Sequence, residues 1–301
     1  MPKRSTPAKP NRREARKELL TAIQAVDLPG VKRLLAADPE LVNAANAHHN
    51  VPLGDALATG NVELVQLLLD LGADAKHRNH GGHSLLDGAA FAGQPALARL
   101  LIEHGAEPTV HHAAALGDLA LLRQLIEADA RLLEPTPAGG RWRMTPLHAA
   151  ARAANLESVR YLLSAGAKVD ALDHNEHTPL ALVVENPEAA AALEVAAVLL
   201  DHGADMNDEA GHHGGGLLHR AVMKGHLELA RLLLERGADP NRTDLSGKAP
   251  LHYAVEKNKA LVALLLEFGP DLTTENLEGE TPVALARRKR RQAIVALLEG
   301  T

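Results

Sequence analysis

Apolar residues recur at helical spacing in short blocks along most of the chain, and most blocks end at a glycine followed by a small residue. In one block, Leu229, Leu232 and Leu233 fall on one side of a helix that stops before Gly237-Ala238. A glycine there suits the left-handed residue that ends many helices. The pattern therefore predicts a series of similar amphipathic helices.

A shorter, alanine-rich block precedes each of these helices by a few residues. Its fullest copy runs Thr145-Pro146-Leu147-His148-Ala149-Ala150, and a second copy follows Ala249. The threonine hydroxyl can cap the first turn, where proline costs nothing because its missing N–H would be unpaired. Each unit is thus predicted to be a pair of helices, followed by a polar stretch suited to a hairpin finger.

The paired blocks repeat with a period of about 33 residues. The threonine position of each copy falls near residues 17, 51, 84, 108, 145, 178, 216, 249 and 281. In period and motif the chain resembles the ankyrin repeat family. The resemblance implies an all-α repeat solenoid of about nine stacked units with capping ends, each unit a helix–turn–helix with a β-hairpin finger. It covers residues 15–301, and residues 1–14 are predicted to form a basic, proline-rich, disordered tail.

A histidine occupies the fourth position of the repeated motif at His111, His148, His219 and His252. The resemblance implies that this histidine hydrogen-bonds neighbouring backbone across the stack. Between units three and four, Gly105-Ala106-Glu107-Pro108 runs directly into Thr109, so one finger is predicted to be missing.

Composition restricts the chemistry. The chain has no Cys and only five aromatic residues, which excludes disulfide scaffolds, thiol catalysis and serial stacking of nucleic-acid bases. The glycine-rich segment 211–216 lacks the Lys-Ser/Thr of a phosphate loop, and no G-x-S-x-G motif is present. We expect no catalytic residue, no cofactor, no metal ligand set and no enzymatic activity.

Charge is unevenly distributed along the chain. The net charge is −6, yet residues 1–17 carry seven Lys or Arg against one Glu, and residues 287–291 are all basic. The acidic remainder favours a basic partner. The basic ends are read as solvated surface, with a nucleic-acid tether as the alternative. No secretory signal or membrane span is visible, so we expect a cytoplasmic protein, or a nuclear one in a eukaryote.

The resemblance implies that the chain is a scaffold that binds a protein or peptide through its concave face and finger tips, most simply as a monomer. The finger tips supply His48, His80, His83, Arg141, Trp142, His174, His177, His212, Leu245 and Leu277. The exposed ends of the first helices supply Thr59, Phe91, Leu116, Arg152, Glu185, Met223, Lys224, Glu256 and Lys257. An alternative is that the histidine-rich fingers bind a transition metal or sense pH.

Overall fold

The computed structural model describes residues 12–134, 143–185, 191–206 and 214–300, and these consist of short helices in consecutive pairs. The chain divides into two compact units, residues Met1–His112 and Ala113–Thr301. Each unit is treated by itself below.

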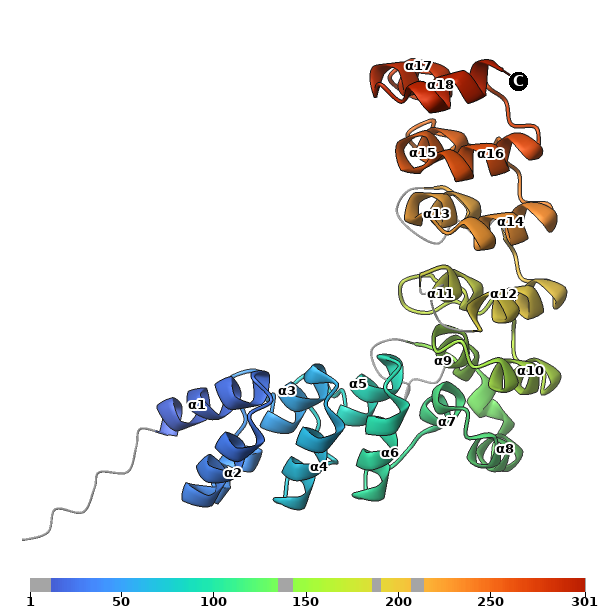
Figure 1. Cartoon of the computed structure of the whole chain (residues 1–301). Helices are drawn as coiled ribbons and strands as arrows, with labels where there is room; N and C mark the ends of the chain where they lie inside the picture. Colours follow the sequence, from blue (N-terminus) through green and yellow to red (C-terminus); the bar gives the residue numbers. More distant parts are fainter. Residues whose placement is uncertain (1–11, 135–142, 186–190, 207–213, 301) are drawn as a thin grey trace, which may run out of the picture. The chain divides into compact units, whose positions relative to one another are not determined.

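In the first unit, the first helices of successive pairs pack on one another, and so do the second helices (Figure 1). Its elements are α1 (Arg12–Gln24), α2 (Leu28–Ala37), the 3-10 helix η1 (Pro39–Asn43), α3 (Pro52–Thr59), α4 (Val62–Asp70), α5 (Leu85–Phe91) and α6 (Pro95–Glu103). Helix α7 (Val110–Leu116) begins in this unit and ends in the next.

Within the second unit, the helices likewise form two layers. The first-helix layer holds α9 (Pro146–Arg152), α11 (Pro179–Glu185), α13 (Leu217–Lys224), α15 (Pro250–Lys257) and α17 (Pro282–Arg288). The second-helix layer holds α8 (Leu119–Ala128), α10 (Leu156–Ser164), α12 (Ala192–Asp201), α14 (Leu227–Glu235), α16 (Lys259–Glu267) and α18 (Gln292–Glu299), and the 3-10 helix η2 (Ala130–Leu133) follows α8. Figure 1 shows these layers as two adjacent columns from α9 to α18.

The predicted all-α solenoid is therefore confirmed: the described residues contain eighteen α-helices and no sheet. The core between the layers is aliphatic. Leu147, Leu162 and Leu180 are fully buried, while Ala149 and Ala150 let the first helices approach closely. The detail of a β-hairpin finger is not confirmed, because the one β-bridge among the described residues joins Arg78 to Ser84.

The frame histidine is the fourth residue of the Thr-Pro-Leu-His motif. Three frame histidines connect their helix pair to the finger that follows it in the sequence. His148 Nδ1 accepts from the backbone N–H of Thr145 at 3.1 Å, and its Nε2 lies 2.9 Å from the carbonyl oxygen of His177 in the next finger. His219 and His252 reach the carbonyls of Lys248 and Glu280 at 3.1 Å in the same way. The cross-stack role implied for these three histidines is confirmed.

The cross-stack role of His111 stays a prediction, but the histidine at the frame position of the fourth pair is His112. Its Nδ1 accepts from the N–H of Thr109 at 3.0 Å, and its Nε2 lies 2.8 Å from Asp87 Oδ1 in α5. The fourth motif therefore starts at Thr109 and not at Pro108, since threonine is the residue that caps the helix. Only six residues separate α6 from α7, so no finger stands between them, as predicted.

The N-terminal boundary also differs from the prediction, because α1 begins at Arg12 and not after residue 14. Arg12 forms an ion pair with Glu40 at 2.9 Å, and Arg16 donates to the carbonyl oxygen of Ala44 at 2.9 Å. Arg16 thus binds backbone carbonyl oxygens of the first finger, as the frame histidines bind finger carbonyls in later helix pairs. These contacts draw the first turn of α1 into the folded unit.

Candidate functional site

Five fingers share one geometry, in which an Asn or Asp closes the loop. Its side-chain Oδ1 accepts the backbone N–H groups two and four residues later, and its own N–H donates to the carbonyl four residues later. For Asp244 the side-chain bonds to the N–H of Ser246 and of Lys248 are 2.8 and 3.0 Å long. The loop-closing residues are Asn46, Asn79, Asp173, Asp244 and Asn276. Sequence analysis missed them, although each lies five residues before a threonine position.

This closure sets which finger residues face the solvent. The residue after the Asn or Asp lies at the tip, and among the described residues it is exposed in every such finger. At Leu245 and Leu277 the exposure reaches 75% and 81%, the highest values for any large hydrophobic side chain described. The backbone N–H of Leu277 donates to the carbonyl oxygen of Ser246 at 3.0 Å, which joins the tips of these two neighbouring fingers.

The structure places the predicted finger residues unevenly. His48, His80 and His174 are exposed, whereas His83 and His177 are half-buried. The ring of His80 stacks on that of His49 in the neighbouring finger, with centroids 4.7 Å apart and planes 11° apart. The predicted residues Arg141, Trp142 and His212 lie outside the described residues.

Stacking does not make the histidine pair a metal site. The lone pairs of parallel imidazoles lie in parallel planes and do not converge on one ion. Within the part of the chain that the structure describes, no group of three or more His, Asp or Glu side chains is arranged to hold a metal. The metal alternative stays a prediction for the remaining finger residues.

The predicted residues on the first helices fall into a half-buried apolar set and an exposed charged set. Phe91, Leu116 and Met223 are half-buried, and the ring of Phe91 lies 5.8 Å from that of the frame histidine His112. The charged set comprises the exposed residues Arg152, Glu185, Lys224 and Lys257, and the half-buried Glu256.

Several of the charged residues pair across successive helix pairs. Glu185 binds both Arg220 and Lys224, at 2.8 and 2.6 Å. Burial favours a raised pKa for the Glu185 carboxyl, but the hydrogen bond from Lys224 and the charges of both cations hold that pKa below its usual range. Glu256 similarly contacts Lys289 at 3.3 Å. The structure thus brings together Glu185 and Lys224, which the sequence placed on separate units.

The basic segment that ends the α17 turn is largely tied to carboxylates. Arg287 pairs with Glu299, and Arg288 with both Glu278 and Glu280. Arg291 donates to the backbone carbonyl of Glu256. These contacts agree with the interpretation of the segment as folded surface and leave less charge for a nucleic-acid tether.

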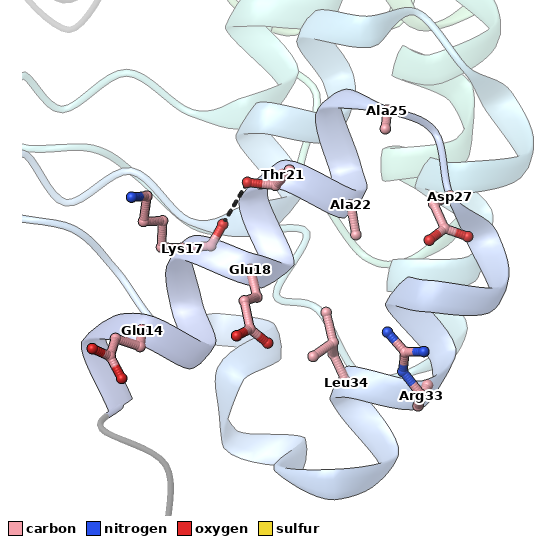
Figure 2. Close-up of a pocket in the computed structure, with 9 residues that line it drawn as sticks. All are labelled: Glu14, Lys17, Glu18, Thr21, Ala22, Ala25, Asp27, Arg33 and Leu34. Carbon is pink, nitrogen blue, oxygen red and sulfur yellow. Dashed lines mark hydrogen bonds between the residues drawn. The ribbon is translucent and has the colours of Figure 1, made fainter.

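A groove of about 590 Å³ lies between α1 and α2 in the first unit (Figure 2). Its lining mixes Glu14, Glu18 and Asp27 with Lys17 and Arg33. Its mixed charge suits an end cap that faces water.

These features define a helical repeat protein whose fingers and first helices carry its candidate binding surface. Three copies of the model named Ankyrin repeats match the chain, over residues 19–112, 110–210 and 218–300. The chain belongs to the ankyrin repeat family, whose repeats are protein-interaction modules.

Similar proteins include the B-cell lymphoma 3 protein homolog of Mus musculus, which is 31% identical over 73% of this chain and 51% of its own length. The nuclear factor NF-kappa-B p105 subunit of Gallus gallus is 31% identical over 70% of this chain and 19% of its own length. The transient receptor potential cation channel subfamily A member 1 homolog of Caenorhabditis elegans is 27% identical over 74% of this chain and 16% of its own length. The chain thus spans about half or less of each relative. No described helix is long and apolar enough to cross a membrane.

Proposed function

We propose that this chain is a non-catalytic protein-binding scaffold that holds a protein or peptide partner against its finger tips and first helices. Membership of the ankyrin family supports a protein partner, and the finger geometry supports the place of binding. The scaffold acts as a monomer in the cytoplasm, or in the nucleus of a eukaryote.

The exposed pair Leu245 and Leu277 carries this proposal. Burying a leucine side chain contributes about 1.5–3 kcal/mol, so two adjacent exposed leucines form an anchor that gains stability only when a partner covers them. Their backbones are joined through Leu277 and Ser246, so the pair is presented with little loss of conformational entropy on binding.

The test is capture of partners from an extract of the native host, with quantitative mass spectrometry. The variant Leu245→Ser/Leu277→Ser is compared with the wild type and with Leu193→Ser, because Leu193 is a 40% exposed leucine on a second helix. We expect a protein that the wild type and Leu193→Ser retain and the double variant loses. Equal capture by all three chains would contradict the proposed surface.

A further inference from the structure

Charge in the second unit is segregated between its two layers of helices. The first helices α9, α11, α13, α15 and α17 carry six Lys or Arg (Arg152, Arg220, Lys224, Lys257, Arg287 and Arg288) against Glu185 and Glu256. The second helices α10, α12, α14, α16 and α18 carry seven Asp or Glu (Glu157, Glu194, Asp201, Glu228, Glu235, Glu267 and Glu299) against Arg160, Arg231 and Lys259. The acidity of the chain therefore does not extend to its first-helix face.

Three lysines at the ends of these helices recur at the same position of their units. Lys224, Lys257 and Lys289 each lie eight residues after the threonine position of their unit, at or just after the end of a first helix. Arg290 and Arg291 follow Lys289 in the turn to α18. A lysine at a helix C-terminus also interacts favourably with the helix dipole. That interaction accounts for one lysine at each helix end but not for the other basic residues beside it.

The carboxylates near this face offset only part of its positive charge, and Arg287 and Arg288 are already paired with Glu299, Glu278 and Glu280. Glu185 is shared by Arg220 and Lys224, which leaves one positive charge in excess at that pair. Glu256 pairs with Lys289. Lys257 and Arg290 are exposed and have no carboxylate partner among the ion pairs of the described residues.

We infer that the first-helix face of α13, α15 and α17 binds an acidic, extended segment of a partner protein, which specifies the partner chemistry of the proposed scaffold and rests on that proposal. Packed helices lie about 8–10 Å apart. A chain in the extended polyproline II conformation advances about 3.1 Å per residue and returns to the same side at every third residue, so one acidic residue in every three matches the lysine row. The net charge of the chain suggested a basic partner. The distribution of charge between the two helix layers instead favours an acidic partner for this face.

A protein segment fits this face better than a nucleic acid. Single strands bind through repeated stacking of bases on aromatic side chains, and the five first helices of this unit carry Tyr253 as their one aromatic residue of the Phe, Tyr and Trp type. A peptide with a carboxylate at every third residue binds through charge and does not need aromatic side chains to stack on.

The probe is a fluorescein-labelled 13-residue peptide with Glu at every third position and Gly, Ser or Ala elsewhere, titrated with the full chain and followed by anisotropy. A second peptide has Gln at the same positions. The test variant is Lys257→Gln/Arg290→Gln, and the matched control is Lys259→Gln, because Lys259 is an exposed lysine two residues away on the second helix α16.

We expect the Glu peptide to bind the wild type about tenfold more tightly than the Gln peptide, and the double variant to lose about tenfold in affinity for the Glu peptide. Lys259→Gln should match the wild type, and raising NaCl from about 50 to 300 mM should weaken binding because surface charge pairs are screened. Equal binding of both peptides, or equal affinity of the double variant and the control, would overturn the inference. Tighter binding of a single-stranded oligonucleotide of the same charge would also overturn it.

Failure of this inference is distinguishable from failure of the proposed scaffold. If the Glu peptide does not bind but Leu245→Ser/Leu277→Ser still loses a captured protein, only the acidic chemistry is wrong. If that double variant captures the same proteins as the wild type, the proposed surface itself is wrong.

Discussion

The contact between Asp87 and His112 gives the sharpest test of the frame-histidine network. Asp87 Oδ1 accepts from His112 Nε2 at 2.8 Å, while Asp87 Oδ2 accepts from the N–H and the hydroxyl of Ser84 at 2.6 and 2.8 Å. The His112 side chain is 2% exposed. Because its Nδ1 must accept from Thr109, its proton lies on Nε2 and points at the carboxylate.

An Asn at position 87 has the same shape as Asp87, but it cannot accept hydrogen bonds from both His112 and Ser84. If the amide oxygen faces His112, the amide NH2 group meets the N–H of Ser84; if it faces Ser84, the NH2 group meets the Nε2–H of His112. Either orientation sets two donors against each other in a partly buried site. The cost of an unmade bond to a buried group is about 1–3 kcal/mol.

The electrostatics give a similar magnitude. Burial by itself raises the pKa of Asp87, but the hydrogen bonds from His112 and Ser84 outweigh it and lower the pKa to about 2 from 3.8. That difference corresponds to about 2 kcal/mol of stability. Since the folded state holds its proton less tightly than the unfolded state, this contribution is present above about pH 4 and is lost as pH falls toward 2.

We therefore expect Asp87→Asn to lower the free energy of unfolding by about 2–3 kcal/mol at pH 7, measured by urea denaturation with circular dichroism. Hydrogen exchange of residues 85–112 locates the effect in the first unit. The gap between wild type and variant should shrink below about pH 4. Glu103→Gln is the control, because Glu103 is an exposed carboxylate on α6. A variant no less stable than this control, or a gap that persists at pH 2, would refute the reasoning.

The remaining predictions concern other contacts. His148→Ala should cost about 3 kcal/mol in urea denaturation, because it leaves the N–H of Thr145 and the carbonyl of His177 unpaired, whereas His48→Ala at an exposed site should cost under about 0.5 kcal/mol; similar losses would contradict the network. Val26 adopts φ +53° in a turn where Gly60 and Gly225 stand in other pairs, so Val26→Gly should raise the melting temperature, and a lower value would argue against strain. Burial and the hydrogen bond to Asp244 raise the pKa of Tyr253 to about 12. In a Tyr161→Phe background its absorbance should titrate there, so the stability that this bond contributes is lost as pH rises from 10 to 12, and a midpoint near 10 would contradict the bond. Zinc or EDTA should shift the melting temperature by less than about 1 °C, and a larger shift would favour the metal alternative.

The helix pairs were predictable because each depends on local rules that recur along the sequence. Thr145, Pro146 and the Ala-rich turn specify a first helix, and Gly237 the end of a second one. The family match and the structure confirm the solenoid, while the count of nine full repeats stays a prediction. A single copy of the motif would have been weak evidence for this fold. The recurrence of the motif at one spacing along the chain is what favoured it over other folds.

The frame histidine was misplaced where the spacing between units changes. With the finger before α7 missing, counting by period selected His111, whereas the chemistry selects His112, three residues after the capping Thr109. A rule based on the cap rather than on the period would have found it. The partner of His112 Nε2 is a carboxylate from α5 and not a finger carbonyl.

The candidate site was less predictable than the fold. The exposed ends of the first helices could be read from the repeat, but the pairing of Glu185 with Lys224 depends on side chains 39 residues apart in sequence. The finger loops were readable in principle, because Asn or Asp recurs five residues before five of the nine threonine positions. The partner-binding role of all these residues stays a proposal.

Hydrogen exchange on the complex tests the central claim most directly. The full chain is measured alone and with the protein that depends on Leu245 and Leu277 for capture. The account predicts new protection in the fingers 243–248 and 275–280 and at the ends of α13 and α15, with α10, α12, α14 and α16 unchanged. Protection confined to the second helices would contradict it.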